Sequence, residues 1–292
     1  MRVGLFTDAL ADRPLQDALA WLGAELPEVR DVEIGTGGFS PAPHCDRAVL
    51  LADDGARREW LDAIEDAGFR LAALNVSGNP LEDEEHDAAL RETVLLAGLL
   101  GVDRVVCMSG GDARLAGAGW FPGLEDDSER YWAERVLPYW RELAAGTEGV
   151  RLCLELEPGN AAFNVTTFER LAGLDDAIAV NLDPSHFFWQ QIDPLAVTRR
   201  LGERIRFVHG KDTAVDGERV TLDGLLDRDR AWRYAAVGRG HDLAWWRSFL
   251  GALDAAGYDG VISIEVEDPL LPPEQATQES AQLLARALEV RA

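Results

Sequence analysis

The feature that most constrains the fold is a repeated alternation of short apolar runs with stretches of helical periodicity. Most of the apolar runs are nearly continuous in Val, Ile, Leu and Phe, as expected for strands buried on both faces of a parallel sheet. The predicted strands span residues 3–7, 32–35, 71–76, 104–108, 150–156, 178–182, 205–209 and 261–266. Eight alternations predict a (β/α)8 TIM barrel, which needs about 250 residues.

An open doubly wound sheet is the alternative, but no G-x-G-x-x-G phosphate fingerprint follows the first strand. No linker or change in composition divides the chain, so we expect residues 1–292 to form one domain. Two long connections, 109–128 and 211–241, would lie at the carboxyl ends of the strands, where barrel enzymes place their chemistry. Both connections are candidate lids.

The charge balance limits the partners of this chain. It has 52 acidic and 28 basic side chains, a net charge of −24, which disfavours binding to nucleic acid or to an anionic membrane. The opening residues lack the pattern of a signal peptide, and no uncharged run is long enough to span a bilayer. The three cysteines lie far apart. We therefore expect a cytoplasmic protein.

The last four predicted strands are apolar until their final residues and then deliver polar side chains. These side chains are Glu155 and Glu157, Asp183 and His186, His209, Lys211 and Asp212, and Glu265 and Glu267. Neighbouring strands would bring Glu155, Asp183, His209 and Glu265 together above the barrel core. Because clustered carboxylates repel one another, the set predicts one divalent cation, Mn²⁺ first and Mg²⁺ or Co²⁺ next. Separate pairing of each acid with an arginine is the alternative.

At these strand ends the chain resembles the xylose isomerase-like superfamily of sugar isomerases and epimerases, which also contains endonuclease IV. The matching motifs are Leu154-Glu-Leu-Glu-Pro, Asn181-Leu-Asp-Pro-Ser-His, Val208-His-Gly-Lys-Asp, Val237-Gly-Arg-Gly-His and Gly257-Tyr-Asp-Gly-Val-Ile-Ser-Ile-Glu. The resemblance implies that Glu155, Asp183, His209 and Glu265 bind the metal ion. It also implies that His186 binds substrate and that Glu155 and Glu265 carry protons.

A metal-chelated carbonyl acidifies the neighbouring C–H bond, so the resemblance favours a sugar or polyol isomerase or epimerase acting through an enediolate. The same first step also serves a lyase or dehydratase that cleaves a 3-keto-glycoside or C-glycoside, or dehydrates an inosose. Ala161 and Val215 stand where ketohexose 3-epimerases have a glutamate and an arginine, which argues against that activity. The expected substrate is a small sugar, keto-sugar or glycoside.

Several further residues are candidates for substrate binding. They are His44, Asn75, Glu157, His186, Lys211, Asp212 and Arg239, of which Arg239 could hold a substrate oxygen or phosphate. For His44 and Asn75, a loop histidine without a role and plain turn chemistry are the alternatives. We expect His86 on a solvated acidic face and His241 as a helix cap. Arg228, Arg230 and Arg233 would pair with Asp223, Asp227 and Asp229.

Some aromatic residues on the connections could stack on a ring of the substrate, although core packing is the usual role of any single one. These residues are Trp120, Phe121, Phe187, Phe188 and Trp189. An endonuclease IV-like nuclease is a remote alternative, because its site needs additional histidines and this chain has five. A non-catalytic partner subunit is the other alternative, although no ligand of the superfamily pattern is missing. Relatives imply a homo-oligomer or a small partner subunit.

Overall fold

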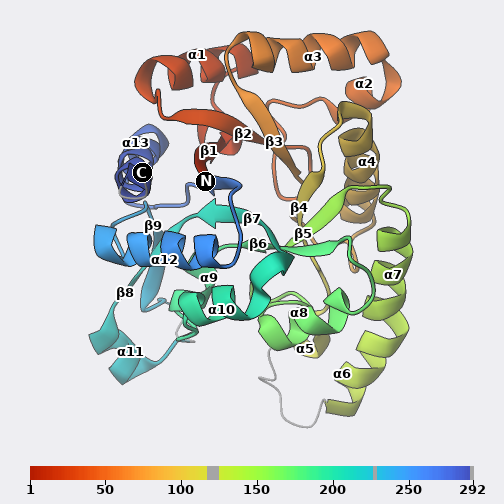
Figure 1. The fold of residues 1–292 in the computed structure, drawn as a ribbon. Coiled ribbons are helices and arrows are strands. Elements are labelled where there is room, and N and C mark those ends of the chain that lie inside the picture. The colour runs from red at the N-terminus through yellow and green to blue at the C-terminus, as the bar shows by residue number, and fades with distance from the viewer. Residues whose placement is uncertain (117–124, 226–228, 290–292) are drawn as a thin grey trace.

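The computed structural model describes residues 1–116, 125–225 and 229–289. Eight parallel strands close into a barrel in the order β1-β10-β7-β6-β5-β4-β3-β2, with helices around the outside (Figure 1). The strands are β1 (Arg2–Phe6), β2 (Val29–Gly35), β3 (Arg70–Asn75), β4 (Arg104–Met108), β5 (Arg151–Glu155), β6 (Ile178–Leu182), β7 (Ile205–Gly210) and β10 (Val261–Ile264). The predicted TIM barrel is confirmed. Strand β2 begins three residues before its predicted start.

The outer layer consists of α-helices with short 3-10 and π segments. The α-helices are α1 (Leu15–Glu25), α2 (Arg47–Ala52), α3 (Asp54–Asp66), α4 (Glu84–Leu100), α5 (Ala113–Ala116), α6 (Glu125–Tyr131), α7 (Leu137–Ala145), α8 (Val165–Ala172), α9 (Ser185–Phe188), α10 (Pro194–Leu201), α11 (Gly217–Asp223), α12 (Leu243–Ala255) and α13 (Pro273–Leu288). The other segments are η1 (Thr7–Leu10), η2 (Trp132–Val136) and η3 (Gly202–Arg204).

Helix α4 shows why these helices begin and end where they do. The Asp83 side chain accepts hydrogen bonds from two amides of its first turn, and Gly101 ends it with a φ of 71°. Among the described residues, no helix is long and apolar enough to cross a membrane.

The inside of the barrel changes from apolar to polar along the strands. The buried residues Ala72, Ala73, Val106, Cys153, Ala179, Phe207 and Val261 form one small apolar cluster. A layer of buried polar side chains comes from the strands themselves: Glu33, Asn75, Glu155, Asn181, His209 and Ser263. Buried polar groups need hydrogen-bond partners, so this layer must be internally paired or hold a ligand.

The predicted lid at 211–241 contains structure that the sequence pattern did not indicate. Strands β8 (Asp212–Val215) and β9 (Trp232–Ala235) form an antiparallel pair outside the barrel, with α11 between them. Strand β9 brings Tyr234 to the site described below. Within the other predicted lid, residues 117–124 lie outside the described part of the chain, and with them Trp120 and Phe121.

Candidate metal centre and substrate cavity

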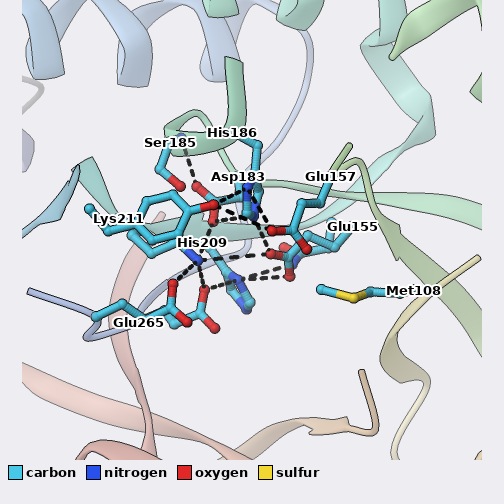
Figure 2. A network of polar contacts seen from close by, with 12 residues as sticks. Met108, Glu155, Glu157, Asp183, Ser185, His186, His209, Lys211 and Glu265 are labelled. Carbon is cyan, nitrogen blue, oxygen red and sulfur yellow. Dashed lines mark hydrogen bonds and ion pairs between the residues drawn. The ribbon is translucent and has the colours of Figure 1, made fainter. Parts of the chain in front are cut away.

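Glu155, Asp183, His209 and Glu265 meet at the carboxyl end of the barrel (Figure 2). One ligand atom from each residue lies within 4.8 Å of the others. Glu155 ends β5, His209 lies in β7, and Asp183 and Glu265 directly follow β6 and β10. The structure therefore brings together the four ligands that the strand ends and the family resemblance indicated.

The donor set of these four residues suits a divalent cation. It combines carboxylate oxygens with one imidazole nitrogen, which hard and borderline divalent ions accept. The buried Oδ2 atom of Asp183 has no hydrogen-bond partner within the described chain, although Lys211 Nζ lies 3.1 Å away. A buried carboxylate oxygen without a hydrogen bond is costly, and a metal ion would satisfy it. These four residues, called the quartet below, thus form a candidate divalent-metal site.

Glu33 is one of the residues of the site that the sequence pattern did not reveal. Its buried carboxylate accepts hydrogen bonds from Asn75 Nδ2 at 2.7 Å and from Ser263 Oγ at 2.6 Å. Its Oε2 atom also lies 3.1 Å from His209 Nε2. The sequence signal that could have revealed Glu33 was an acidic residue between the apolar residues of a short strand. Asn75, predicted to bind substrate, holds Glu33 and also accepts a hydrogen bond from Ser77 N.

His186 lies on the other side of the quartet and connects it to β9. Its Nε2 atom lies 2.7 Å from Glu155 Oε1 and 3.3 Å from Asp183 Oδ2, and its Nδ1 atom lies 2.8 Å from the Tyr234 hydroxyl. Burial alone would lower the pKa of His186, but the neighbouring Asp183 carboxylate raises that pKa to about 9. The Tyr234 hydroxyl also donates to Glu157 at 3.4 Å.

Lys211 is buried among carboxylates at the edge of the quartet. Its Nζ atom lies 2.6 Å from Glu265 and 3.0 Å from Glu267, in addition to its contact with Asp183. Burial would lower the pKa of Lys211, but these carboxylates raise it well above its usual value. In turn, the pKa of Glu265 falls to about 2 despite its burial, because Lys211 and His209 are close. Lys211 is therefore a fixed positive charge of the site.

A cavity of about 230 Å³ opens beside the quartet. Its lining residues are Phe6, Asp8, Ala9, Phe39, Ser40, Asn75, Ser77, Met108, Glu155, Glu265, Val266 and Glu267. Four of these residues are acidic, and the described lining includes no Lys, Arg or His. A larger depression of about 710 Å³ lies around His44 and includes no member of the quartet.

Three predicted substrate-binding residues are engaged elsewhere. His44 is buried between Thr7 Oγ1 and the Arg13 carbonyl, at 2.9 and 3.0 Å. Arg239 forms an ion pair with Glu279 at 2.7 Å on the outside of the barrel, so its charge is already compensated there. Asp212 Oδ2 accepts hydrogen bonds from the amides of Gly238, Gly240 and His241 and thereby holds their loop.

The structure corrects two expectations for other histidines. His86 is not simply solvated, because its Nδ1 atom accepts a hydrogen bond from Asn79 N at 3.0 Å. His241 does not cap α12, because Asp242 accepts the capping hydrogen bond. His241 instead binds Asp212 and stacks on Phe188, with ring centroids 3.7 Å apart.

Arg230 and Arg233 make other contacts than the sequence predicted, whereas the described aromatic residues pack against neighbouring side chains, which was the alternative to substrate stacking. Arg233 pairs with Asp268, and Arg230 lies over the Trp232 ring. Arg228 and Asp227 fall outside the described residues. Phe187 packs in the core. Trp189 stacks on Trp232, with centroids 4.5 Å apart.

Comparison with known proteins agrees with this geometry. The family model described as "xylose isomerase-like TIM barrel" matches residues 32–287. The uncharacterized protein YfiH of Bacillus subtilis (strain 168) is 36% identical over 313 residues, covering 99% of each chain.

Three solved structures share the fold at identities below 20%. The probable 3-DHS dehydratase AsbF from Bacillus anthracis is 14% identical, with a TM-score of 0.69 over 98% of this chain and 99% of that one. The IOLI protein, solved with a bound zinc atom, is 19% identical, with a TM-score of 0.67 over 99% of both chains. An L-ribulose 3-epimerase is 17% identical, with a TM-score of 0.65 over 99% of this chain and 95% of that one.

Proposed function

The chain belongs to the xylose isomerase-like TIM barrel family, and from this premise we propose that it is a metal-dependent isomerase or epimerase of a sugar or polyol. The observation that carries the proposal is the quartet of ligand atoms within 4.8 Å at one side of a cavity. A divalent ion bound there, Mn²⁺ in our proposal, would stabilise the negative charge that develops on substrate oxygens in an enediolate.

Glu155 and Glu265 have the position needed for proton transfer. Both line the cavity, so their carboxylates can reach a C–H bond of a sugar bound there. His186 Nε2 holds Glu155 Oε1 at 2.7 Å, and Lys211 Nζ holds Glu265 Oε2 at 2.6 Å. These contacts fix the direction of each carboxylate, which is the protein's main contribution to an oriented proton transfer.

The charge of the cavity indicates an uncharged substrate. Asp8, Glu155, Glu265 and Glu267 line it, and the nearby Lys211 ammonium is already compensated by carboxylates. A phosphate or carboxylate group in this space would face these like charges, and the described lining offers no Lys, Arg or His side chain to pair with it. The proposed substrate is therefore a neutral sugar, keto-sugar or glycoside and not a sugar phosphate.

Elimination is the second candidate reaction, and one observation favours it. The Tyr234 hydroxyl reaches both His186 and Glu157, and burial raises the pKa of the Glu157 carboxyl above its usual value. Such a group can donate a proton to the oxygen of a leaving group, a step that isomerisation does not require. The alternative is a lyase or dehydratase acting on a 3-keto-glycoside, C-glycoside or inosose.

The test is an NMR screen in D₂O with the Mn²⁺-loaded protein, the metal being removed before spectra are recorded. The probes are D-fructose, D-psicose, L-ribulose, an inosose and a 3-keto-glucoside, with fructose 6-phosphate as the charged comparison. We expect deuterium uptake at carbon in a neutral probe and none in the phosphate ester. Release of an aglycone or formation of an enone would support elimination instead.

Variants connect the reaction to the quartet. Glu155→Gln and Asp183→Asn should lose both bound Mn²⁺ and deuterium exchange, while circular dichroism shows an intact barrel. Glu279→Gln, on α13 outside the site, should retain both. Full exchange by the wild type in excess EDTA, or normal Mn²⁺ content in both quartet variants, would contradict the proposal.

A further inference from the structure

Asp8 is a half-buried acid of the cavity that none of the steps above uses. It lies in η1, directly after β1, a strand that contributes none of the four ligands. It lines the same cavity as Glu155 and Glu265. Its Oδ1 atom is buried and accepts no hydrogen bond from the described residues. A buried carboxylate oxygen in that condition calls for a partner that the chain does not supply, such as a substrate hydroxyl.

The backbone beside Asp8 leaves room for its carboxyl group. Gly35 ends β2 beside it, and a Cβ atom at this position would lie only 2.8 Å from Asp8 Oδ1. Any larger residue would therefore displace the carboxyl group or the adjacent Ser40 side chain. The glycine keeps open the space that Asp8 occupies.

Ser77 provides a second unpartnered polar atom in the lining of the same cavity. Its buried Oγ has no hydrogen bond within the described chain, and the residue lines the same cavity as Asp8. Its backbone is fixed, because its amide donates to Asn75 Oδ1 at 3.0 Å and its carbonyl accepts from Phe39 N at 2.7 Å. Two unsatisfied polar atoms in the lining of one cavity favour the binding of hydroxyl groups there.

The charges that face Asp8 favour its protonated form. Burial raises the pKa of its carboxyl to about 6, and the Glu33 and Glu265 carboxylates add to the rise, while the Ser40 hydroxyl opposes it. A group that titrates near neutral pH can both give and take a proton.

We propose that Asp8 is a catalytic acid–base residue that exchanges a proton with the oxygens of the substrate. The proposal rests on the function proposed above. A carboxylate of the quartet removes the C–H proton, and the electron pair of that C–H bond forms the carbon–carbon double bond. The carbonyl oxygen then takes the proton of the Asp8 carboxyl group, which gives an enediol.

The second half of the reaction returns every proton. The Asp8 carboxylate takes the proton of the neighbouring hydroxyl, whose oxygen forms the new C=O bond. The electron pair of the double bond takes back a proton at carbon from the quartet carboxyl group. Asp8 thus ends protonated, as it began, and no other reactant is consumed.

The test uses the full-length Mn²⁺-loaded protein and the neutral probe that exchanges fastest in the screen. Asp8→Asn should lower kcat by about 10²- to 10⁴-fold, the usual range for a general acid–base group, and change KM by less than about threefold. Bound Mn²⁺ and the melting profile should show a folded, loaded protein. Asp12→Asn, which removes an exposed charge nearby, should leave kcat unchanged.

Chemical rescue separates proton transfer from a purely structural role. Formate should restore exchange to Asp8→Ala, because it supplies a carboxyl group in the vacated space, and should not restore exchange to Ser77→Ala. The kcat profile of the wild type should include an acid–base titration that Asp8→Asn lacks.

The possible failures can be told apart. Exchange by Asp8→Asn within about threefold of the wild type, while Glu155→Gln is inactive, overturns the role of Asp8 alone. Lack of rescue together with an unchanged pH profile also overturns it. Absence of exchange by the wild type on every probe contradicts the proposed function itself, and the role of Asp8 falls with it.

Discussion

The ring of His209 lies between two carboxylates, with Nε2 3.1 Å from Glu33 Oε2 and Nδ1 3.1 Å from Glu265 Oε2. An ionised carboxylate only accepts hydrogen bonds, so Glu33 requires a proton on Nε2. Nδ1 is then the nitrogen that faces the ligand oxygens. Burial would lower the pKa of His209, but Glu33 and the neighbouring carboxylates raise it well above its usual value. A metal ion must therefore displace the Nδ1 proton.

Glu33→Gln tests this relationship. The amide group can place N–H donors opposite Nε2, which removes the preference for a proton there. We expect Mn²⁺ affinity to fall by about 10- to 100-fold, as when other partners of ligating histidines are changed. Calorimetric titration with Mn²⁺ measures the change. Ser263→Ala removes a different hydrogen bond of Glu33 and should weaken binding less. Equal affinities in Glu33→Gln and wild type would refute this role.

Replacing Lys211 should make the protein depend more strongly on metal. Lys211→Met leaves the carboxylates of Asp183, Glu265 and Glu267 without their cation, so the EDTA-treated variant should lose several kcal/mol of stability. Added Mn²⁺ supplies positive charge at the same place, and its thermal shift should exceed that of the wild type. Scanning calorimetry with and without Mn²⁺ measures both effects. Arg239→Met, which breaks an exposed pair, should leave stability nearly unchanged.

Asp212→Ala should destabilise the protein without weakening metal binding. The carboxylate holds three amides of the loop at 2.9–3.0 Å and the His241 ring at 2.7 Å, and within the described chain it forms no hydrogen bond or ion pair with the quartet. Losing these hydrogen bonds should cost at least about 3 kcal/mol in urea unfolding. Asp216→Ala, which removes one capping bond of α11, should cost about 1 kcal/mol. A large drop in Mn²⁺ affinity would instead place Asp212 in the site.

The raised pKa of Asp8 predicts that the difference in stability between Asp8→Asn and the wild type changes with pH. Its pKa is about 6 in the folded protein against an ordinary value of 3.8. Below about pH 4 the carboxyl is protonated in both states, whereas above that pH the unfolded chain loses the proton first, so ionisation destabilises the fold. Asp8→Asn should therefore match the wild type at pH 4 and exceed it by at most about 3 kcal/mol at pH 8.

Urea unfolding in EDTA at the two pH values measures this difference. Asp12→Asn is the control, because the hydrogen bond from Arg13 lowers the pKa of Asp12 and its removal should bring no gain at pH 8. A stability difference between Asp8→Asn and wild type that does not change with pH would contradict the raised pKa.

The barrel and the quartet were predictable because both follow from local patterns. Alternating apolar strands and helices favour a parallel barrel, and the carboxyl ends of its strands share one face. Polar residues at four successive strand ends must then lie near one another. Glu33 and Tyr234 were not found in this way. Glu33 is 176 residues from His209, and Tyr234 belongs to a strand in a connection without clear periodicity.

Lys211 and Asp212 show the limit of sequence reasoning most directly. They are adjacent and both follow a predicted ligand, so the pattern assigned them one role. The structure separates them, with Lys211 among the carboxylates of the site and Asp212 holding the loop at residues 238–241. The architecture and the face that carries the chemistry could be predicted from the amino-acid pattern, because both depend on periodicity. Which polar groups face one another emerged from the folded chain, because that depends on packing between segments far apart in the sequence.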